Sequence, residues 1–176
     1  YELDRIDRIG SLTSIYIPKV DKINKKIYDI ADIIETMEIL RSDKGCPWDR
    51  EQTHHSIRES VIEEAYEVVD AIDKKDLDGL VEELGDLFLQ IVFHCQIAWE
   101  EGEFNLYDVM TELNKKLIYR HPHVFDEKKV EKSDDVVYNW NKLKFKDRNI
   151  STYTDILKDV PKLPSLMRSF KVQERA

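Results

Sequence analysis

The stretch that decides the fold is LVEELGDLFLQIVFHCQIAW, residues 80–99. Drawn as a helix with 100° per residue, it is apolar nearly all round, which is typical of a helix in the middle of a bundle. Four of its six polar exceptions share one narrow sector of the helix. These four are Glu83, Asp86, Gln90 and His94. The sequence therefore predicts a mostly buried helix that carries acids on one side.

Helical periodicity continues on both sides of this stretch. Before it, Thr53 is the expected N-cap of a helix ending near Asp73, and a two-residue connection makes the two helices antiparallel neighbours. After it, Gly102 ends the central helix and Asn105 caps the next one. The expected helices are 21–42, 53–73, 76–101, 105–120 and 133–147, with a loop at 43–52 and the beginning of another helix after Pro164. The predicted fold is all-α and resembles an antiparallel four-helix bundle.

Composition supports helices and restricts the function. The chain has 176 residues, 41% of them hydrophobic, and only 5 Gly and 5 Pro, too few breakers for an all-β protein with many tight turns. Its net charge of −9 disfavours nucleic-acid polymers and anionic membranes as partners. No apolar run is long enough for a membrane span and no signal peptide opens the chain, so we expect a soluble, cytoplasmic protein. Two cysteines, Cys46 and Cys95, are too few for a disulfide scaffold.

Four carboxylates on the two central helices are candidate metal ligands. Glu64 borders the apolar stripe of helix 53–73 and Glu67 lies next to it. Packing this helix against the following one brings both acids opposite Glu83 and Asp86. Four acids in one place repel one another unless a cation lies between them. Oxygen ligands without a His or Cys cluster favour Mg²⁺, with Mn²⁺ also suitable.

Two other interpretations of these acids compete with the metal site. Acidic stripes neutralised by Lys and Arg, at the surface or in an oligomer interface, produce the same spacing, and the residues alone leave this alternative open. A di-iron bundle needs two Glu-x-x-His units, whereas the chain has only Glu51–His54. Histidines 54, 55, 121 and 123 are expected to pack or to cap helices rather than bind metal.

Several ordered motifs together resemble the MazG family of all-α nucleoside triphosphate pyrophosphohydrolases. They are KGCPWDREQTHHSIR (44–58), VIEEAYEVVDAI (61–72), LVEELGDLFLQIVFHCQIAWEEGEF (80–104), KLIYRHPHVF (116–125) and NWNKLK (139–144). The resemblance extends from about Ile33 to the end of the chain, and EExxE at 63–67 followed by ExxD at 83–86 is similar to the family's metal signature.

This resemblance implies an activity and a set of residues. Glu64, Glu67, Glu83 and Asp86 would hold Mg²⁺, with Glu63 close by. The implied reaction is hydrolysis of nucleoside triphosphates between the α- and β-phosphates, giving a monophosphate and pyrophosphate, and family members pair as dimers. The alternative is a non-catalytic helical module that binds nucleotides or mediates assembly, whose acids form ion pairs.

The family pattern also indicates residues that would contact the substrate. Lys116 and Arg120, one turn apart, and Lys144 would meet phosphates. Trp140 would stack on the base, and Trp48 in the loop would contact base or ribose. Each has an ordinary structural alternative: core packing for Trp140, surface solubility for the three cations and stabilisation of a turn for Trp48.

The first 20 residues lie outside the hydrolase motifs. YELDRIDRIGSLTSIYIP resembles the end of the tetrapyrrole methylase domain that is fused ahead of this hydrolase in some bacterial proteins. We therefore expect a linker or tail at 1–20, left from such a fusion, and a MazG-like domain at 21–176 that continues beyond the last residue.

Overall fold

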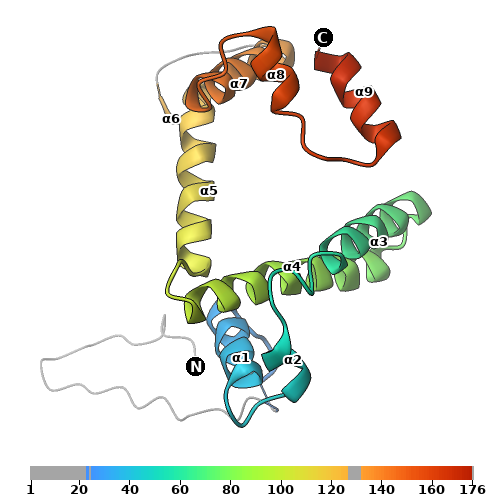
Figure 1. The fold of residues 1–176 in the computed structure, drawn as a ribbon, viewed down its shortest axis with the longest axis vertical. Coiled ribbons are helices and arrows are strands. Elements are labelled where there is room, and N and C mark those ends of the chain that lie inside the picture. The colour runs from blue at the N-terminus through green and yellow to red at the C-terminus, as the bar shows by residue number, and fades with distance from the viewer. Residues whose placement is uncertain (1–22, 24, 127–131, 176) are drawn as a thin grey trace, which may run out of the picture. The chain divides into compact units, whose positions relative to one another are not determined.

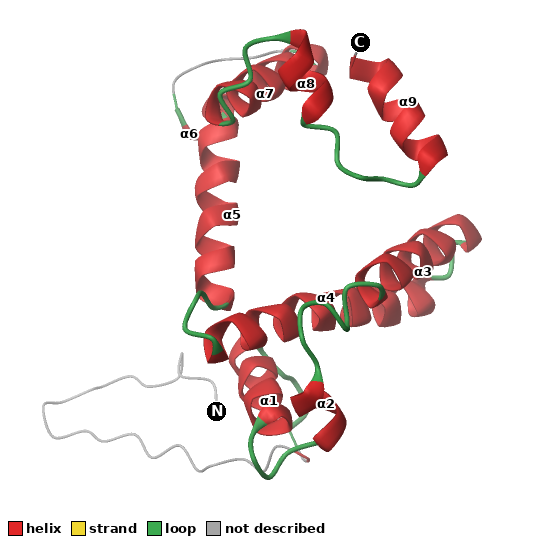
Figure 2. Cartoon of the chain, viewed as in Figure 1, coloured by secondary structure: helices red, strands yellow, loops and turns green. Residues whose placement is uncertain are grey.

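The computed structural model describes residues 23, 25–126 and 132–175, and every regular element in these ranges is a helix (Figures 1 and 2). The helices are α1 (Ile30–Arg41), α2 (Pro47–Glu51), α3 (Ser60–Lys74), α4 (Leu77–Glu100), α5 (Leu106–Arg120), α6 (Pro122–Phe125), α7 (Ser133–Asp147), α8 (Tyr153–Lys158) and α9 (Ser165–Arg175). The all-α prediction is confirmed. The chain forms two compact units, Tyr1–Ile97 and Ala98–Ala176. No helix in the described ranges is long and apolar enough to cross a bilayer.

The predicted helix ends are correct at positions where neighbouring residues form a cap. Asn105 accepts hydrogen bonds from the N–H groups of Tyr107 and Asp108, and the Asp108 side chain accepts from the Asn105 N–H, which completes a capping box. Gly102 takes a positive φ of 75° after α4, a conformation that suits glycine. The helix expected at 133–147 is found with those bounds as α7.

The first predicted helix begins later than expected, and the loop after it contains a short helix. The predicted helix at 21–42 begins at Ile30 in the described residues, because the Asp29 side chain caps the N–H groups of Ala31 and Asp32. The loop expected at 43–52 contains the short helix α2, which has Pro47 at its first position.

Thr53 was the expected cap of the next helix, and this prediction is wrong. Its Oγ1 accepts from the Ser56 N–H at 3.2 Å, while the Ser56 Oγ accepts from the Thr53 N–H at 2.9 Å. These bonds close a local turn, and α3 begins only at Ser60. Lys75, in the left-handed region with φ 59°, ends α3 and turns the chain into α4.

The core of the first unit surrounds the carboxyl-terminal half of α4. Its buried residues there are Val92, Phe93, Cys95, Gln96 and Ile97. The Trp48 ring of α2 meets the Phe93 ring edge-on with centroids 6.5 Å apart, and the Arg41 guanidinium lies 5.4 Å from the same ring centroid. Arg41 also donates hydrogen bonds to the carbonyl oxygens of Asp49 and Gln52. These contacts hold α1 and α2 against α4.

The amino-terminal half of α4 differs from the prediction of a mostly buried helix. Five large apolar side chains of α4, four in this half and one just past its end, keep between 36% and 74% of their surface exposed in the single chain. They are Leu77, Val81, Leu84, Phe88 and Ile91. The spacing of these residues alternates between four and three, so they form one stripe, which we call the α4 stripe.

A histidine pair joins the segment before α3 to α4. The rings of His54 and His94 are stacked with an interplanar angle of 6°, and their Nδ1 atoms lie 2.7 Å apart. One nitrogen donates and the other accepts, so this contact requires at least one neutral ring. Burial, together with the adjacent His54, lowers the pKa of His94 below its usual 6.5.

Acidification is therefore expected to destabilise the first unit through this pair. The unfolded chain binds the His94 proton near pH 6.5, and the folded chain binds it only at lower pH. The stabilisation is thus complete above pH 6.5 and is lost as the pH falls below it. Urea unfolding between pH 7.5 and 5.5 should show a decreasing free energy of unfolding, with a shallower slope in His94→Gln. The exposed His55→Gln is the control, and equal slopes in both variants and the wild type would refute this prediction.

Candidate metal centre

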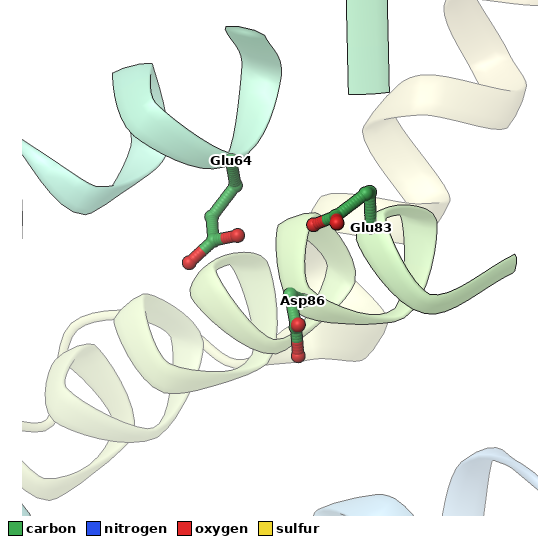
Figure 3. A group of neighbouring side chains, drawn as sticks. All are labelled: Glu64, Glu83 and Asp86. Carbon is green, nitrogen blue, oxygen red and sulfur yellow. The ribbon is translucent and has the colours of Figure 1, made fainter. Parts of the chain in front are cut away.

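Helices α3 and α4 bring three acids together (Figure 3). Glu64 comes from α3, and Glu83 and Asp86, three residues apart, come from α4. One carboxylate oxygen of each lies within 4.8 Å of the other two. Because the connection at Lys75 reverses the chain, the Glu64 side chain extends from α3 toward α4 (Figure 3). The predicted convergence of acids from two adjacent helices is found for these three residues, which we call the acid cluster.

Glu67, the fourth predicted ligand, lies beside the acid cluster rather than within it. It is exposed, yet its charge raises the pKa values of both Glu64 and Glu83.

Burial and repulsion between acids both disfavour the charged carboxylates of the cluster. Burial is the largest cause that raises the pKa of Glu64, and the charges of Asp86 and Glu67 raise it further. Burial also raises the pKa of Glu83, followed by the charges of Glu67 and Glu82. In the part of the chain that the structure describes, none of the three cluster acids forms an ion pair with Lys or Arg, whereas Asp70 on the same α3 pairs with Lys74.

The donor set fits a hard divalent cation. Carboxylate oxygens are the ligands that Mg²⁺ and Mn²⁺ prefer. Two oxygens bound to one Mg²⁺ at about 2.1 Å are separated by about 3–4 Å. The 4.8 Å limit on the cluster is slightly wider, so side-chain rotation alone would close it. A cation at this position would replace repulsion with attraction.

The second unit holds four of the five residues predicted to contact substrate. Lys116 and Arg120 lie one turn apart on α5 and line the same cavity of about 800 Å³. Lys144 of α7 lines another, smaller cavity. Burial lowers the pKa of Lys144, and the charges of Arg175 and Arg148 lower it further.

The two predicted base-contacting tryptophans have different surroundings. Trp48, in the first unit, is 62% exposed, and its ring packs edge-on against Phe93. Trp140 lies under the Arg120 guanidinium, whose central carbon is 5.3 Å from the ring centroid. The His121 ring meets Trp140 at 60° with centroids 4.9 Å apart, so His121 packs as the sequence suggested.

Sequence reasoning missed Asp147. Its carboxylate pairs with Arg120, with the Nη2–Oδ2 distance at 3.2 Å. The two residues are 27 positions apart, and no local spacing relates them. The contact requires α5 to pack against α7, and no sequence motif predicts that packing.

Comparison with known proteins relates these features to a family. Residues 52–125 match the model of the MazG nucleotide pyrophosphohydrolase domain. The chain is 43% identical to the nucleoside triphosphate pyrophosphohydrolase of Escherichia coli strain K12 over 81% of its own length and 55% of the relative. It is 44% identical to the nucleoside triphosphate pyrophosphohydrolase/pyrophosphatase MazG of Thermotoga maritima over 82% of its length and 55% of the relative.

One relative matches almost the whole chain. The uncharacterized protein YabN of Bacillus subtilis is 41% identical over 99% of this chain and 36% of its own length. The chain thus spans between about a third and just over half of these three relatives. None of the comparisons supports the methylase remnant expected at residues 1–20, which lie outside the described residues.

A solved structure shows the same fold. The crystal structure of a mazG-related protein from Thermotoga maritima matches 65% of this chain and 98% of its own, with a TM-score of 0.55 and 27% identity. The family match covers Glu64, Glu83 and Asp86 together. Residues 52–125 of this chain are therefore similar in sequence to the MazG nucleotide pyrophosphohydrolase domain, and the chain shares the all-helical fold of a mazG-related protein.

Proposed function

We propose that this chain hydrolyses nucleoside and deoxynucleoside triphosphates to monophosphates and pyrophosphate, with Mg²⁺ held by Glu64, Glu67, Glu83 and Asp86. The observation that carries the proposal is the acid cluster inside the MazG domain, whose carboxylates have no cationic partner in the described residues. This observation disfavours the alternative of a non-catalytic module whose acids form ion pairs. The names of the Escherichia coli and Thermotoga maritima relatives support the reaction.

The reaction breaks the bond between the α-phosphorus and the oxygen that bridges to the β-phosphate. A water oxygen adds to the α-phosphorus, the pyrophosphate leaves with the bridging oxygen, and the water proton passes to solvent or a nearby base. Bound Mg²⁺ would lower the pKa of water at the site and neutralise phosphate charge. Glu64, Glu83 and Asp86, which converge, together with the adjacent Glu67, are the carboxylates that would bind the cation.

Cationic side chains would balance the remaining charge of a triphosphate. Lys116, Arg120 and Lys144 are the residues we assign to phosphate oxygens. Trp48 is the better base contact of the two tryptophans because most of its ring is exposed. Trp140 offers a base only the ring surface that Arg120 leaves uncovered.

An assay of reaction products tests the proposal. The full chain is incubated with a panel of nucleoside and deoxynucleoside triphosphates and Mg²⁺, and monophosphate, pyrophosphate and orthophosphate are separated by chromatography. We expect equal amounts of monophosphate and pyrophosphate, and no turnover when Mg²⁺ is chelated. Release of orthophosphate and diphosphate would contradict cleavage at the α–β bond. Nucleotide binding without turnover would favour the non-catalytic module.

Lys116→Ala is expected to raise the KM for triphosphate about 10-fold, since one ion contact to phosphate is worth about 1.4 kcal/mol. The kcat should change less, and the Mg²⁺ concentration that gives half-maximal activity should stay the same. Lys158→Ala, at an exposed position on α8, is the control. A changed Mg²⁺ requirement with an unchanged KM would contradict a role of Lys116 in substrate binding and indicate a role in the metal centre.

We also propose that the chain forms a homodimer through the α4 stripe. The stripe follows the a/d pattern of a coiled-coil seam, and its five side chains are at least 36% exposed in the single chain. Among the described residues no large side chain is fully buried, so the single chain has a small core for its apolar content. A second copy presents an identical stripe, which makes it a self-complementary partner.

A further inference from the structure

The Arg120 guanidinium is buried but only partly satisfied. The residue is 8% exposed, and its Nε and Nη2 groups donate to a single oxygen of Asp147, at 3.4 and 3.2 Å. A guanidinium has five N–H donors, so three have no protein acceptor in the described part of the chain. Buried donors without acceptors are costly. Arg120 lines a cavity, so these donors are placed where an anion could accept from them.

Two neighbours fix the orientation of this guanidinium, and a third packs behind one of them. Asp147 holds it by the edge and the Trp140 ring lies against its face. Trp140 and Asp147 are seven residues apart on α7, two turns along one helical face, so α7 presents both to α5. His121 packs against Trp140, and its own ring is held by a 2.6 Å hydrogen bond between Nδ1 and the Leu117 carbonyl oxygen.

We propose that Asp147 is a positioning residue for substrate binding, which sets the free donors of Arg120 toward phosphate oxygens in the cavity. This inference rests on the proposed function. The charged residues that line the cavity are three cations and three acids, Lys115, Lys116, Arg120, Asp108, Glu112 and Asp147. Lys115 pairs with Glu112, and Asp147 has 35% of its side chain exposed. A carboxylate this close to a bound triphosphate repels it. A benefit of Asp147 to binding must therefore come through Arg120, whose guanidinium it holds by two donors.

A purely structural ion pair between α5 and α7 is the competing explanation, and kinetics separate the two. In the full chain, Asp147→Asn keeps the size and one acceptor oxygen but removes the charge. We expect the KM for triphosphate to rise about 10-fold with kcat within about 3-fold of wild type, equivalent to about 1.4 kcal/mol of binding. Asp147→Glu should recover part of the loss. A lower thermal midpoint with unchanged KM would overturn the proposal in favour of the structural role.

A double-mutant cycle tests whether Asp147 acts through Arg120. Once Arg120→Ala has removed the guanidinium, adding Asp147→Asn should not raise KM further. A full additional effect in the double variant would overturn the proposal, and so would tighter binding by Asp147→Asn alone.

Calorimetry with inorganic tripolyphosphate provides a readout without turnover. Asp147→Asn should bind this anion about 10-fold more weakly than wild type. If the wild type hydrolyses no nucleotide, the proposed function fails while this measurement still decides the role of Asp147. If the wild type is active and Asp147→Asn binds tripolyphosphate normally, only the inference about Asp147 fails.

Discussion

Glu64→Gln and Asp86→Asn are each expected to lower kcat/KM for triphosphate hydrolysis by about 10³-fold or more. Each substitution removes one negative charge and one oxygen ligand from the acid cluster while keeping the side-chain shape. The loss corresponds to about 4 kcal/mol of transition-state stabilisation, a reasonable share for a residue that holds a catalytic cation. The measurement is pyrophosphate release over a range of Mg²⁺ concentrations.

Thermal unfolding distinguishes loss of the metal from loss of the fold. Burial and neighbouring acids raise the pKa of Glu64, so its charge opposes folding when no cation is present. Without Mg²⁺, Glu64→Gln should therefore unfold at the same or a higher temperature than wild type. The stabilisation that Mg²⁺ gives to the wild type should be reduced in this variant. A large drop in the unfolding temperature without metal would contradict this account of the cluster.

An exposed acid on the same helix serves as the control for charge. Asp73→Asn removes one carboxylate from α3 outside the acid cluster and should keep wild-type activity. If Glu64→Gln and Asp86→Asn are as active as Asp73→Asn, the acid cluster is not the catalytic metal centre. The non-catalytic module would then be the better explanation.

Leu84→Lys is expected to convert the homodimer into monomers. Leu84 occupies the middle of the α4 stripe and is 49% exposed in the single chain. In a dimer built on this stripe, two lysines would meet across the seam without acceptors, and a charge buried in that way costs several kcal/mol. Light scattering coupled to gel filtration should show half the wild-type mass at micromolar concentration.

Leu89→Lys is the matched control, because it makes the same chemical change at similar exposure. Leu89 is 40% exposed but lies about 140° around α4 from Leu84, away from the stripe. We expect Leu89→Lys to remain dimeric. Dissociation of both variants, or of neither, would show that the α4 stripe is not the dimer interface.

The local parts of the fold could be predicted because their causes are local. The Asn105 capping box, the left-handed turn at Gly102 and the bounds of α7 depend on residues within one or two helical turns. The start of α3 was wrong for the same kind of reason. Thr53 and Ser56 form the reciprocal bonds of a capping box, but they cap a single turn, and the continuous helix begins only at Ser60.

The acid cluster could be predicted in part. Helical angles put Glu64, Glu83 and Asp86 toward the partner helix, and the structure brings their oxygens within 4.8 Å. The same angles put Glu67 near them, but the rotamer of a long, exposed side chain is not determined by its place on the helix. Glu67 consequently lies beside the acid cluster rather than within it.

The sequence by itself determined that the chain is helical, where α4, α5 and α7 lie, and which helix faces carry acids and cations. Periodicity and caps suffice for this because hydrogen bonds within a helix connect residues four apart. Only the tertiary structure decided that His54 stacks on His94 and that Arg120 is held between Asp147 and Trp140. These partners are 20 to 40 residues apart, and they meet only through helix packing, whose register depends on the fit of many side chains at once.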